Sequence, residues 1–379
     1  GKWEMVRLGE ISTINMGQSP LSESYNDSGE GVPFFQGKTD FGLVNPKVRV
    51  YCNNPIKIAN ENDVLISVRA PVGAVNIASR KCCIGRGLAA ISERSRVSHY
   101  KYLYNYLKYR ENEIASMGVG STFKAISKRD LNSILIPLPP LPVQQQIADV
   151  LDRANSLMEK RKAQIEKLDL LIKAQFIEMF GDPVTNPKGW TVEKLSEMGE
   201  VNRGVSKHRP RNDPKLLGGK YPLIQTGDVA NAGLYIVDYS STYSDFGLAQ
   251  SKMWNKGTLC ITIAANIAKT GILAFDSCFP DSIVGFVPNN RTNTYFINYW
   301  FSFFQKILEE QAPESAQKNI NLRILYELDI ICPPIILQNE FASFVQQVES
   351  QKLLLQQSLA KLEQTYKSLM QKCFRGEIF

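Results

Sequence analysis

Hydrophobic residues recur every three or four positions over two long stretches of the chain, residues 144–180 and 338–374. In the first stretch these positions are Ile147, Leu151, Ala154, Met158, Arg161, Ile165, Leu168, Ile172, Gln175 and Met179. Adding 194 to each number gives Phe341, Val345, Val348, Lys352, Leu355, Leu359, Leu362, Tyr366, Leu369 and Cys373. This is the a/d seam of a coiled coil, sustained for about five heptads. Because the two seams match in register, we expect the two helices to pair with each other.

Two unrelated amphipathic core helices would also produce such a pattern. Each stretch is about three times as long as the average globular helix of about 11–12 residues, and the duplication also favours a coiled coil. Pro139-Pro140 precedes the first stretch and Pro333-Pro334 the second. Paired prolines suit a helix start and prevent the helix from extending backwards. Arg161 and Lys352 interrupt the seam without a clear partner in either helix direction.

The segments before the two helices repeat as well. The first opens on Trp3 and the second on Trp190, and further identities follow at offsets between 187 and 194. Each contains a β-rich run, at residues 63–68 and 258–263, that is followed by a glycine turn. Each then contains an aromatic helix-like segment, at residues 100–109 and 295–304, which we interpret as core and not as base-stacking surface. The repeated unit is therefore a domain.

A helix stop separates the two halves of the chain. Gly181 is followed by Pro183, and the chain restarts in a turn at 187–189. We therefore expect globular domains at residues 1–140 and 187–333, and long helices, the first with its junction, at residues 141–186 and 334–379. This makes the chain an α+β protein with two mixed α/β domains.

Charge and composition narrow the class of protein. The 379 residues are 44% hydrophobic and carry a net charge of +7. Residues 1–140 hold 18 Lys/Arg against 12 Asp/Glu, a net +6, whereas residues 187–333 hold 15 against 14, a net +1. Positive charge concentrated in the globular parts fits a polyanionic ligand.

Further compositional features bear on metals, redox chemistry and compartment. The seven cysteines include no C-x-x-C pair and lie mostly in apolar runs, so we interpret them as small core residues. No run of 18 or more apolar residues and no signal-like amino terminus occurs. We therefore expect a cytoplasmic protein without a metal site.

Catalytic motifs are missing from the sequence. The chain has two histidines, His99 and His208, and contains no glycine-rich nucleotide loop, no methyltransferase motif and no Glu-x-Lys nuclease element. An enzyme is thus disfavoured. A stand-alone DNA-binding protein associated with a methyltransferase or nuclease stays open, as does a coiled-coil scaffold without DNA specificity. A scaffold would leave the two large, diverged domains unexplained.

Three motifs carry a family resemblance: Pro-Leu-Pro-Pro-Leu at 137–141, Met-Phe-Gly-Asp-Pro at 179–183 with Asn-Pro-Lys-Gly-Trp at 186–190, and the terminal Phe-Arg-Gly-Glu-Ile-Phe at 374–379. In these motifs the chain resembles the specificity subunit of type I restriction-modification systems over its whole length. One departure is that the Glu usual before the helix-start Gln is Val143 in the first copy and Leu337 in the second.

The resemblance implies a fold, a function and partners. It implies two target-recognition domains separated by an antiparallel helix pair with overall pseudo-twofold symmetry. It implies recognition of a bipartite double-stranded DNA target without catalysis by the chain itself. Two modification subunits and restriction subunits would dock on it, and S-adenosylmethionine, ATP and Mg²⁺ would belong to those partners.

Base reading requires Arg, Lys, Asn or Gln side chains on exposed turns, with hydroxyl groups and cations holding phosphates. In the first block such candidates are Gln18, Ser19, Gln36, Lys38, Arg69, Arg86 and Lys124. In the second block they are Ser206, Lys207, His208, Arg209, Gln225, Asn266, Lys269, Gln317, Lys318 and Asn319. The repeat places Gln36 opposite Gln225, and Arg69 roughly opposite Asn266 and Lys269.

Overall fold

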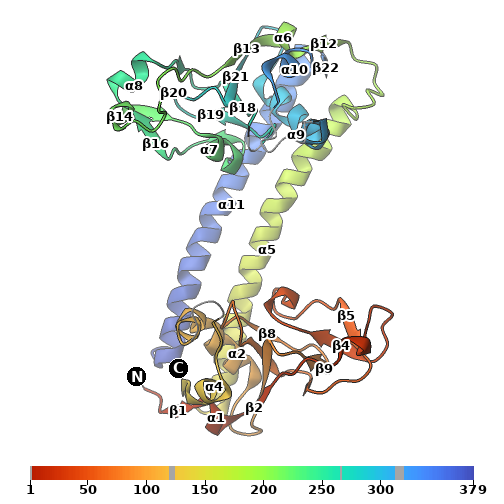
Figure 1. Cartoon of the computed structure of the whole chain (residues 1–379), viewed down its shortest axis with the longest axis vertical. Coiled ribbons are helices and arrows are strands. Elements are labelled where there is room, and N and C mark those ends of the chain that lie inside the picture. The colour runs from red at the N-terminus through yellow and green to blue at the C-terminus, as the bar shows by residue number, and fades with distance from the viewer. Residues whose placement is uncertain (1, 119–123, 265–266, 312–319) are drawn as a thin grey trace. The chain divides into compact units, whose positions relative to one another are not determined.

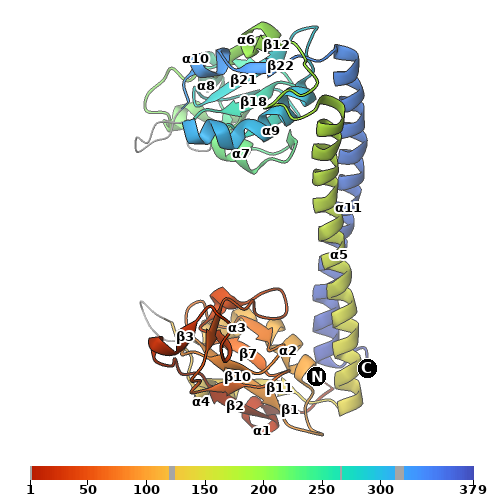
Figure 2. The ribbon, with the colours of Figure 1, turned by 90° about the vertical axis from the view of Figure 1, so that its right-hand side faces the viewer.

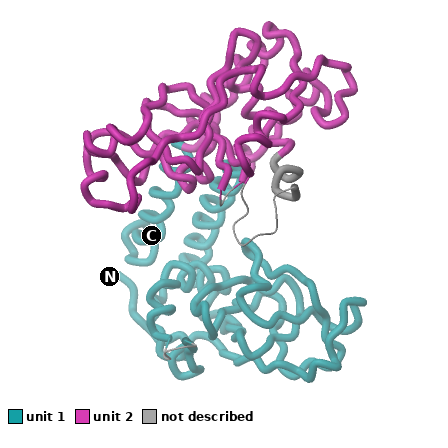
Figure 3. Tube along the Cα trace, turned by 45° about the horizontal axis from the view of Figure 1, so that its top comes forward, with its two compact units in different colours: residues 1–162, 357–379 teal, residues 163–356 magenta. Residues whose placement is uncertain are grey.

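A computed structural model of the chain describes residues 2–118, 124–264, 267–311 and 320–379. The chain divides into two compact units, one comprising residues 1–162 and 357–379 and the other residues 163–356 (Figure 3). We call them unit 1 and unit 2. Each unit contains one globular part and a portion of both long helices.

The two long helices are α5 (Leu141–Phe180) and α11 (Ile335–Arg375). Both begin directly after a double proline, three residues earlier than the heptad pattern predicts. In the portions that belong to each unit the two helices lie side by side (Figure 1 and Figure 2). Unit 1 packs Ile147 and Leu151, from the start of α5, in one core with Cys373 from the end of α11. The pair is therefore antiparallel.

Unit 2 repeats this arrangement with the helices exchanged. Its core contains Ile172 from the end of α5 together with Phe341 and Val345 from the start of α11. The predicted seam positions are accordingly buried or half-buried along both helices. Farther from the globular part of unit 2, Ile165 and Leu355 are half-buried.

The expectation that Lys352 has no clear partner is wrong. Its Nζ lies 2.6 Å from Asp169 Oδ1 on α5 and 3.4 Å from Glu349 Oε1 on its own helix. The side chain is only 13% exposed. Arg161 differs, because its buried Nε has no hydrogen-bond partner among the described residues.

The end of α5 is capped by the junction that follows it. Gly181 has φ +79° and its amide donates to the carbonyl of Ile177 at 2.8 Å, which is the expected geometry of a helix stop. The indole Nε1 of Trp190 donates to the carbonyl of Phe180 at 2.8 Å. The ammonium of Lys188 donates to the carbonyls of Glu178 and Met179. The junction thus returns to the helix end that it leaves.

The globular part of unit 1 contains two larger sheets and a two-stranded closure. Its described helices are α1 (Leu8–Ile11), α2 (Tyr100–Tyr109), α3 (Glu111–Ser116) and α4 (Lys128–Ser133). One sheet has the order β2 (Ser12–Met16), β10 (Leu88–Glu93), β7 (Val64–Ser67) and β8 (Val75–Ile77). The other has the order β3 (Tyr25–Asn26), β5 (Val50–Cys52), β4 (Val32–Phe35), β9 (Cys82–Ile84) and β6 (Ile58–Ala59). Strands β1 (Met5–Arg7) and β11 (Leu135–Pro137) pair antiparallel and join the start of the domain to the segment before α5.

Unit 2 follows the same plan. Its described helices are α6 (Leu195–Met198), α7 (Thr226–Asn231), α8 (Asp245–Ala249), α9 (Thr294–Gln311) and α10 (Leu322–Tyr326). Its first sheet has the order β13 (Gly199–Arg203), β21 (Ile283–Pro288), β18 (Leu259–Thr262), β19 (Thr270–Leu273) and β15 (Tyr235–Ile236). Its second has the order β16 (Ser241–Tyr243), β14 (Leu217–Leu223), β20 (Ser277–Cys278) and β17 (Met253–Trp254). Strands β12 (Val192–Lys194) and β22 (Asp329–Ile331) form the closure.

The cores explain why these segments fold as they do. All four residues of β7 and all four of β18 are buried, as in strands that are covered on both faces. The aromatic segments are core, as predicted: Tyr102 and Tyr106 in α2 and Trp300 in α9 are buried. All seven cysteines are free thiols, and burial raises the pKa of Cys82 to about 12.

Candidate nucleic-acid interface

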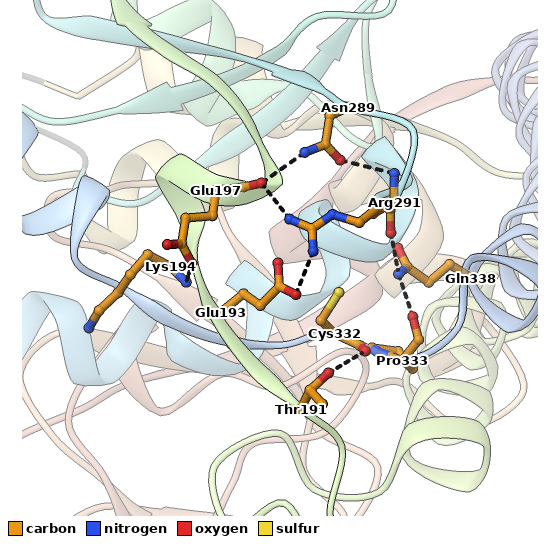
Figure 4. Close-up of polar contacts among 9 residues, drawn as sticks. All are labelled: Thr191, Glu193, Lys194, Glu197, Asn289, Arg291, Cys332, Pro333 and Gln338. Atoms are coloured by element: carbon orange, nitrogen blue, oxygen red, sulfur yellow. Dashed lines mark hydrogen bonds and ion pairs between the residues drawn. The ribbon is translucent and has the colours of Figure 1, made fainter.

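One buried glutamine at the start of each long helix fixes the globular part of its unit to that helix. Gln144 Oε1 accepts the amide of His99 at 2.9 Å, and its Nε2 donates to the carbonyls of Val97 and Pro139. In unit 2, Gln338 Oε1 accepts the amide of Asn293 at 2.9 Å. Its Nε2 donates to the carbonyls of Arg291 and Pro333 (Figure 4). Both glutamines are fully buried.

Further contacts extend this connection in unit 2. The guanidinium of Arg291 contacts Glu193 Oε1 at 2.7 Å and the carbonyl of Glu197 at 3.1 Å (Figure 4). Thr191 Oγ1 donates to the carbonyl of Cys332 at 3.2 Å. The helix start is therefore hydrogen-bonded to the loop before α9, and that loop to β12.

A hollow of about 230 Å³ on unit 1 brings together four of the candidates, Gln36, Lys38, Arg69 and Arg86. They come from three separate segments. Gln36 and Lys38 follow β4, Arg86 follows β9, which pairs parallel with β4, and Arg69 follows β7. Because parallel strands end at the same edge of a sheet, the turns after β4 and β9 lie together.

The main chain around Gln36 and Arg86 is held closely. The hydroxyl of Ser19 lies 3.0 Å from Gln36 Nε2 and accepts the amide of Arg86 at 3.2 Å. A Cβ on Gly87 would lie 2.4 Å from the carbonyl oxygen of Gln36, so this approach requires glycine. Gln18 is exposed beside them.

The cations around the hollow differ in their pairing. Lys38 Nζ lies 4.0 Å from Glu111 Oε1. Among the described residues no hydrogen bond or ion pair is formed by the side chains of Arg69, Arg86 or Lys124. Lys124 precedes Ala125, which bridges to Arg69. All three side chains are exposed.

In unit 2 most of the candidates after β13 form hydrogen bonds or ion pairs with other residues of the same unit. Ser206 is only 7% exposed, so it offers less surface to DNA than the exposed candidates, and its role stays a prediction. The amides of Lys207 and His208 donate to Gln250 Oε1. The amide of Lys215 and then the ring of His208, 2.9 Å away, lower the pKa of Asp213.

Arg209 and its neighbour Arg211 both face Asp281, at 3.9 and 2.6 Å. Gln225 follows β14 as Gln36 follows β4 and is half-buried. The main chain of Lys269 is held by Thr262 Oγ1 at 3.0 Å. Asn266, Gln317, Lys318 and Asn319 lie outside the described residues.

The strand register corrects one predicted correspondence between the repeats. Ser67 pairs with Leu88 in unit 1, and Thr262 pairs with Ile283 in unit 2. Arg69 lies two residues after Ser67, so its counterpart is Ala264, not Asn266 or Lys269.

The same register assigns a counterpart to Arg86. Arg86 lies two residues before Leu88, and Asp281 lies two residues before Ile283. Asp281 and Arg211 were not among the residues predicted from the sequence. An offset of 195 between the repeats, beside the 194 of the helices, would have pointed to Asp281.

The described residues offer neither a metal site nor a membrane span. In this part of the chain no cluster of three or more His, Cys, Asp or Glu side chains could hold a metal ion. Within the same residues, no helix has the length and apolar character needed to cross a membrane.

Comparison with known proteins identifies the family. A family model described as the type I restriction modification DNA specificity domain matches residues 1–167 and 187–364. The chain belongs to this family. As a type I specificity subunit it recognises the DNA target of a restriction-modification system and is not itself the catalyst.

Individual relatives agree with this assignment. The MjaIX specificity subunit of Methanocaldococcus jannaschii is 22% identical over 99% of this chain and 93% of its own length. The putative MjaX specificity subunit of the same organism is 52% identical, over 44% of this chain and 40% of its own length.

Two solved structures share the fold. The S subunit of a type I system from M. genitalium has a TM-score of 0.61 at 16% identity, covering 98% of this chain and 96% of its own. A chain from work on complex assembly and conformational transition of the type I R-M system has a TM-score of 0.63 at 18% identity, covering 99% of this chain and 98% of its own.

Proposed function

We propose that this subunit reads a bipartite DNA target, with one half-site for each globular part, and that residues 1–140 and 187–333 are the two recognition domains. The main support is that the two globular parts share the same arrangement of strands but carry different side chains at equivalent positions after those strands. Gln36 and Gln225 follow equivalent strands, whereas Arg86 and Asp281 are opposite in charge at equivalent positions. Domains built alike but with different edge chemistry suit two different half-sites.

The helix pair is proposed to set the gap between the half-sites. Helix α5 has 40 residues and is about 60 Å long at roughly 1.5 Å per residue. Half-sites read from one face of a duplex lie about one turn, roughly 34–36 Å, apart. Antiparallel helices of this length can hold two domains at such a distance, and residues 141–186 and 334–379 would serve as this spacer.

The same helices are proposed to dock the catalytic partners. Several large apolar side chains on them are exposed to solvent, which leaves apolar surface that a partner can cover. They are Leu157, Leu170, Leu171 and Ile177 on α5, and Ile336, Leu353 and Leu354 on α11. Two modification subunits would cover these side chains, and restriction subunits would complete the nuclease.

Cofactors follow from this division of labour. S-adenosylmethionine would be bound by the modification subunits, and ATP and Mg²⁺ by the restriction subunits, so this chain would hold none of them. The complex would act in the cytoplasm, where its DNA substrate lies.

Mapping adenine methylation in a genome that carries the complete system tests the proposal. The expected result is a motif of two specified parts separated by a gap without base preference. A single uninterrupted motif would refute the split target.

A further inference from the structure

We infer that Arg69 and Arg86 each read a guanine in the half-site assigned to residues 1–140. The inference rests on the proposed function and deepens it, because it assigns a base type to one half of the target. It starts from the hollow of about 230 Å³ on unit 1, which both arginines line.

Both guanidinium groups are available for a ligand. Within the described part of the chain neither forms a hydrogen bond or an ion pair, and both side chains are exposed. An arginine presents a planar fork of donors that matches the O6 and N7 acceptors of guanine in the major groove. Two free forks on one concave surface therefore fit guanine edges better than any other base edge.

The main chain that carries Arg86 is fixed, as base reading requires. Its amide donates to Ser19 Oγ, and the same hydroxyl contacts the amide group of Gln36. Gly85 and Gly87 flank it, and a Cβ on either would lie 2.4 Å from an oxygen of Gln36. The loop therefore sits directly against Gln36 and can shift little.

Arg69 is held from two sides. Its carbonyl accepts the hydroxyl of Ser67 at 2.9 Å, and its main chain bridges to Ala125. The next residue of that segment, Ile126, donates its amide to the carbonyl of Val68 at 3.0 Å. A positioned main chain suits base reading, because a side chain that reads a base edge must reach it with a defined geometry.

The neighbouring lysines suit the phosphate role instead. Lys38 is close to Glu111, and Lys124 directly precedes Ala125, which bridges to Arg69. An ammonium group is a point charge without the fork geometry, so it fits the two acceptors of guanine less closely than a guanidinium group and binds phosphates well.

Unit 2 has neither arginine at the equivalent positions. Ala264 replaces Arg69, and Asp281 replaces Arg86 and is contacted by Arg209 and Arg211. The guanine pair is therefore expected in one half-site and not as a repeated feature of both.

Charge-conserving variants test this directly. Arg69→Lys and Arg86→Lys are each assembled with wild-type modification subunits, and Arg80→Lys, an exposed arginine outside this hollow, is the matched control. Each complex is titrated with duplexes in which one base pair of the half-site is replaced at a time. The preference for guanine at one position should fall roughly 5- to 150-fold in each variant, with the salt dependence unchanged.

The outcomes separate the inference from the proposed function. Unchanged base preference in both lysine variants would mean that the guanidinium forks do not read guanine, and the inference would be overturned. A specific wild-type complex whose first half-site lacks guanine would also overturn it while leaving the proposed function intact. A wild-type complex with no base preference at all would overturn both.

Discussion

Among the described residues, Lys352 is the only cation of a largely buried ion cluster between the two long helices of unit 2. Replacing it by methionine removes that positive charge. The Lys352 side chain is 13% exposed and that of Glu349 is 16% exposed, whereas Asp169 is 49% exposed. The substitution keeps the volume and the apolar stem but leaves Glu349 buried without its cation. Sequence alone presents Lys352 as a defect in the seam, so the variant tests whether the cluster stabilises the helix pair.

The size of the effect follows from burial. Breaking a fully buried ion pair by removing one partner costs about 3–5 kcal/mol, because an uncompensated charge stays in the interior. The half-exposed carboxylate of Asp169 is hydrated in the variant, so it adds little to the cost. We therefore expect a loss of about 2–3 kcal/mol in the free energy of unfolding of unit 2. Adding Glu349→Gln should restore most of that loss.

The loss should depend on pH. Burial raises the pKa of Glu349, and Lys352 is the main group that opposes this rise. Without Lys352 the pKa rises further above its unfolded value, so the charged carboxylate destabilises the fold at high pH. That destabilisation falls as pH drops through the folded pKa. The Lys352→Met variant should therefore lose more stability at pH 8 than at pH 5.

Urea unfolding followed by tryptophan emission measures this. Trp190, Trp254 and Trp300 belong to unit 2 and only Trp3 to unit 1, so emission reports mainly on unit 2. Lys173→Met, at an exposed position of α5, is the matched control and should change stability by less than about 0.5 kcal/mol. An equal loss at pH 5 and pH 8, or no recovery in the double variant, would refute the account of the cluster.

Three further predictions concern DNA and partners. Exchanging Lys38 and Lys124 for glutamine should flatten the salt dependence of DNA binding by roughly one unit of slope per lost phosphate contact, and identical slopes would show that both face solvent. Inserting four residues after Phe180, about one helical turn or roughly 6 Å, should change the gap between half-sites or abolish binding; activity on the original gap would mean that the junction is a tether and not part of a ruler. The subunit alone, supplied with S-adenosylmethionine, should methylate no DNA, and incorporation of labelled methyl groups would contradict this.

Local periodicity and composition predicted the framework well. The seam, the helix stop at Gly181 and the aromatic cores depend on residues close in sequence, whose spacing determines which face they share. The sequence repeat also shows that a glutamine, Gln144 or Gln338, stands at the start of each long helix. Their hydrogen bonds to main-chain groups about 45 residues away were not visible, because those depend on how the domain folds back on the helix.

The candidate site could be predicted only in part. Residue type and expected exposure selected Gln36, Arg69 and Arg86, which the fold brings to one hollow. The same criteria also selected Ser206, which packing buries. The equivalence of the Arg86 and Asp281 positions in the two repeats depends on strand register. The partner of Lys352 depends on helix direction. Neither is encoded by local pattern.

The central claim is that each recognition domain reads its own half of the target. Exchanging residues 187–333 for the corresponding block of a related specificity subunit, and mapping methylation with the unchanged partner subunits, tests it most directly. The account predicts that one half of the methylated motif changes while the other half and the gap stay the same. A motif altered in both halves, or left unaltered, would contradict it.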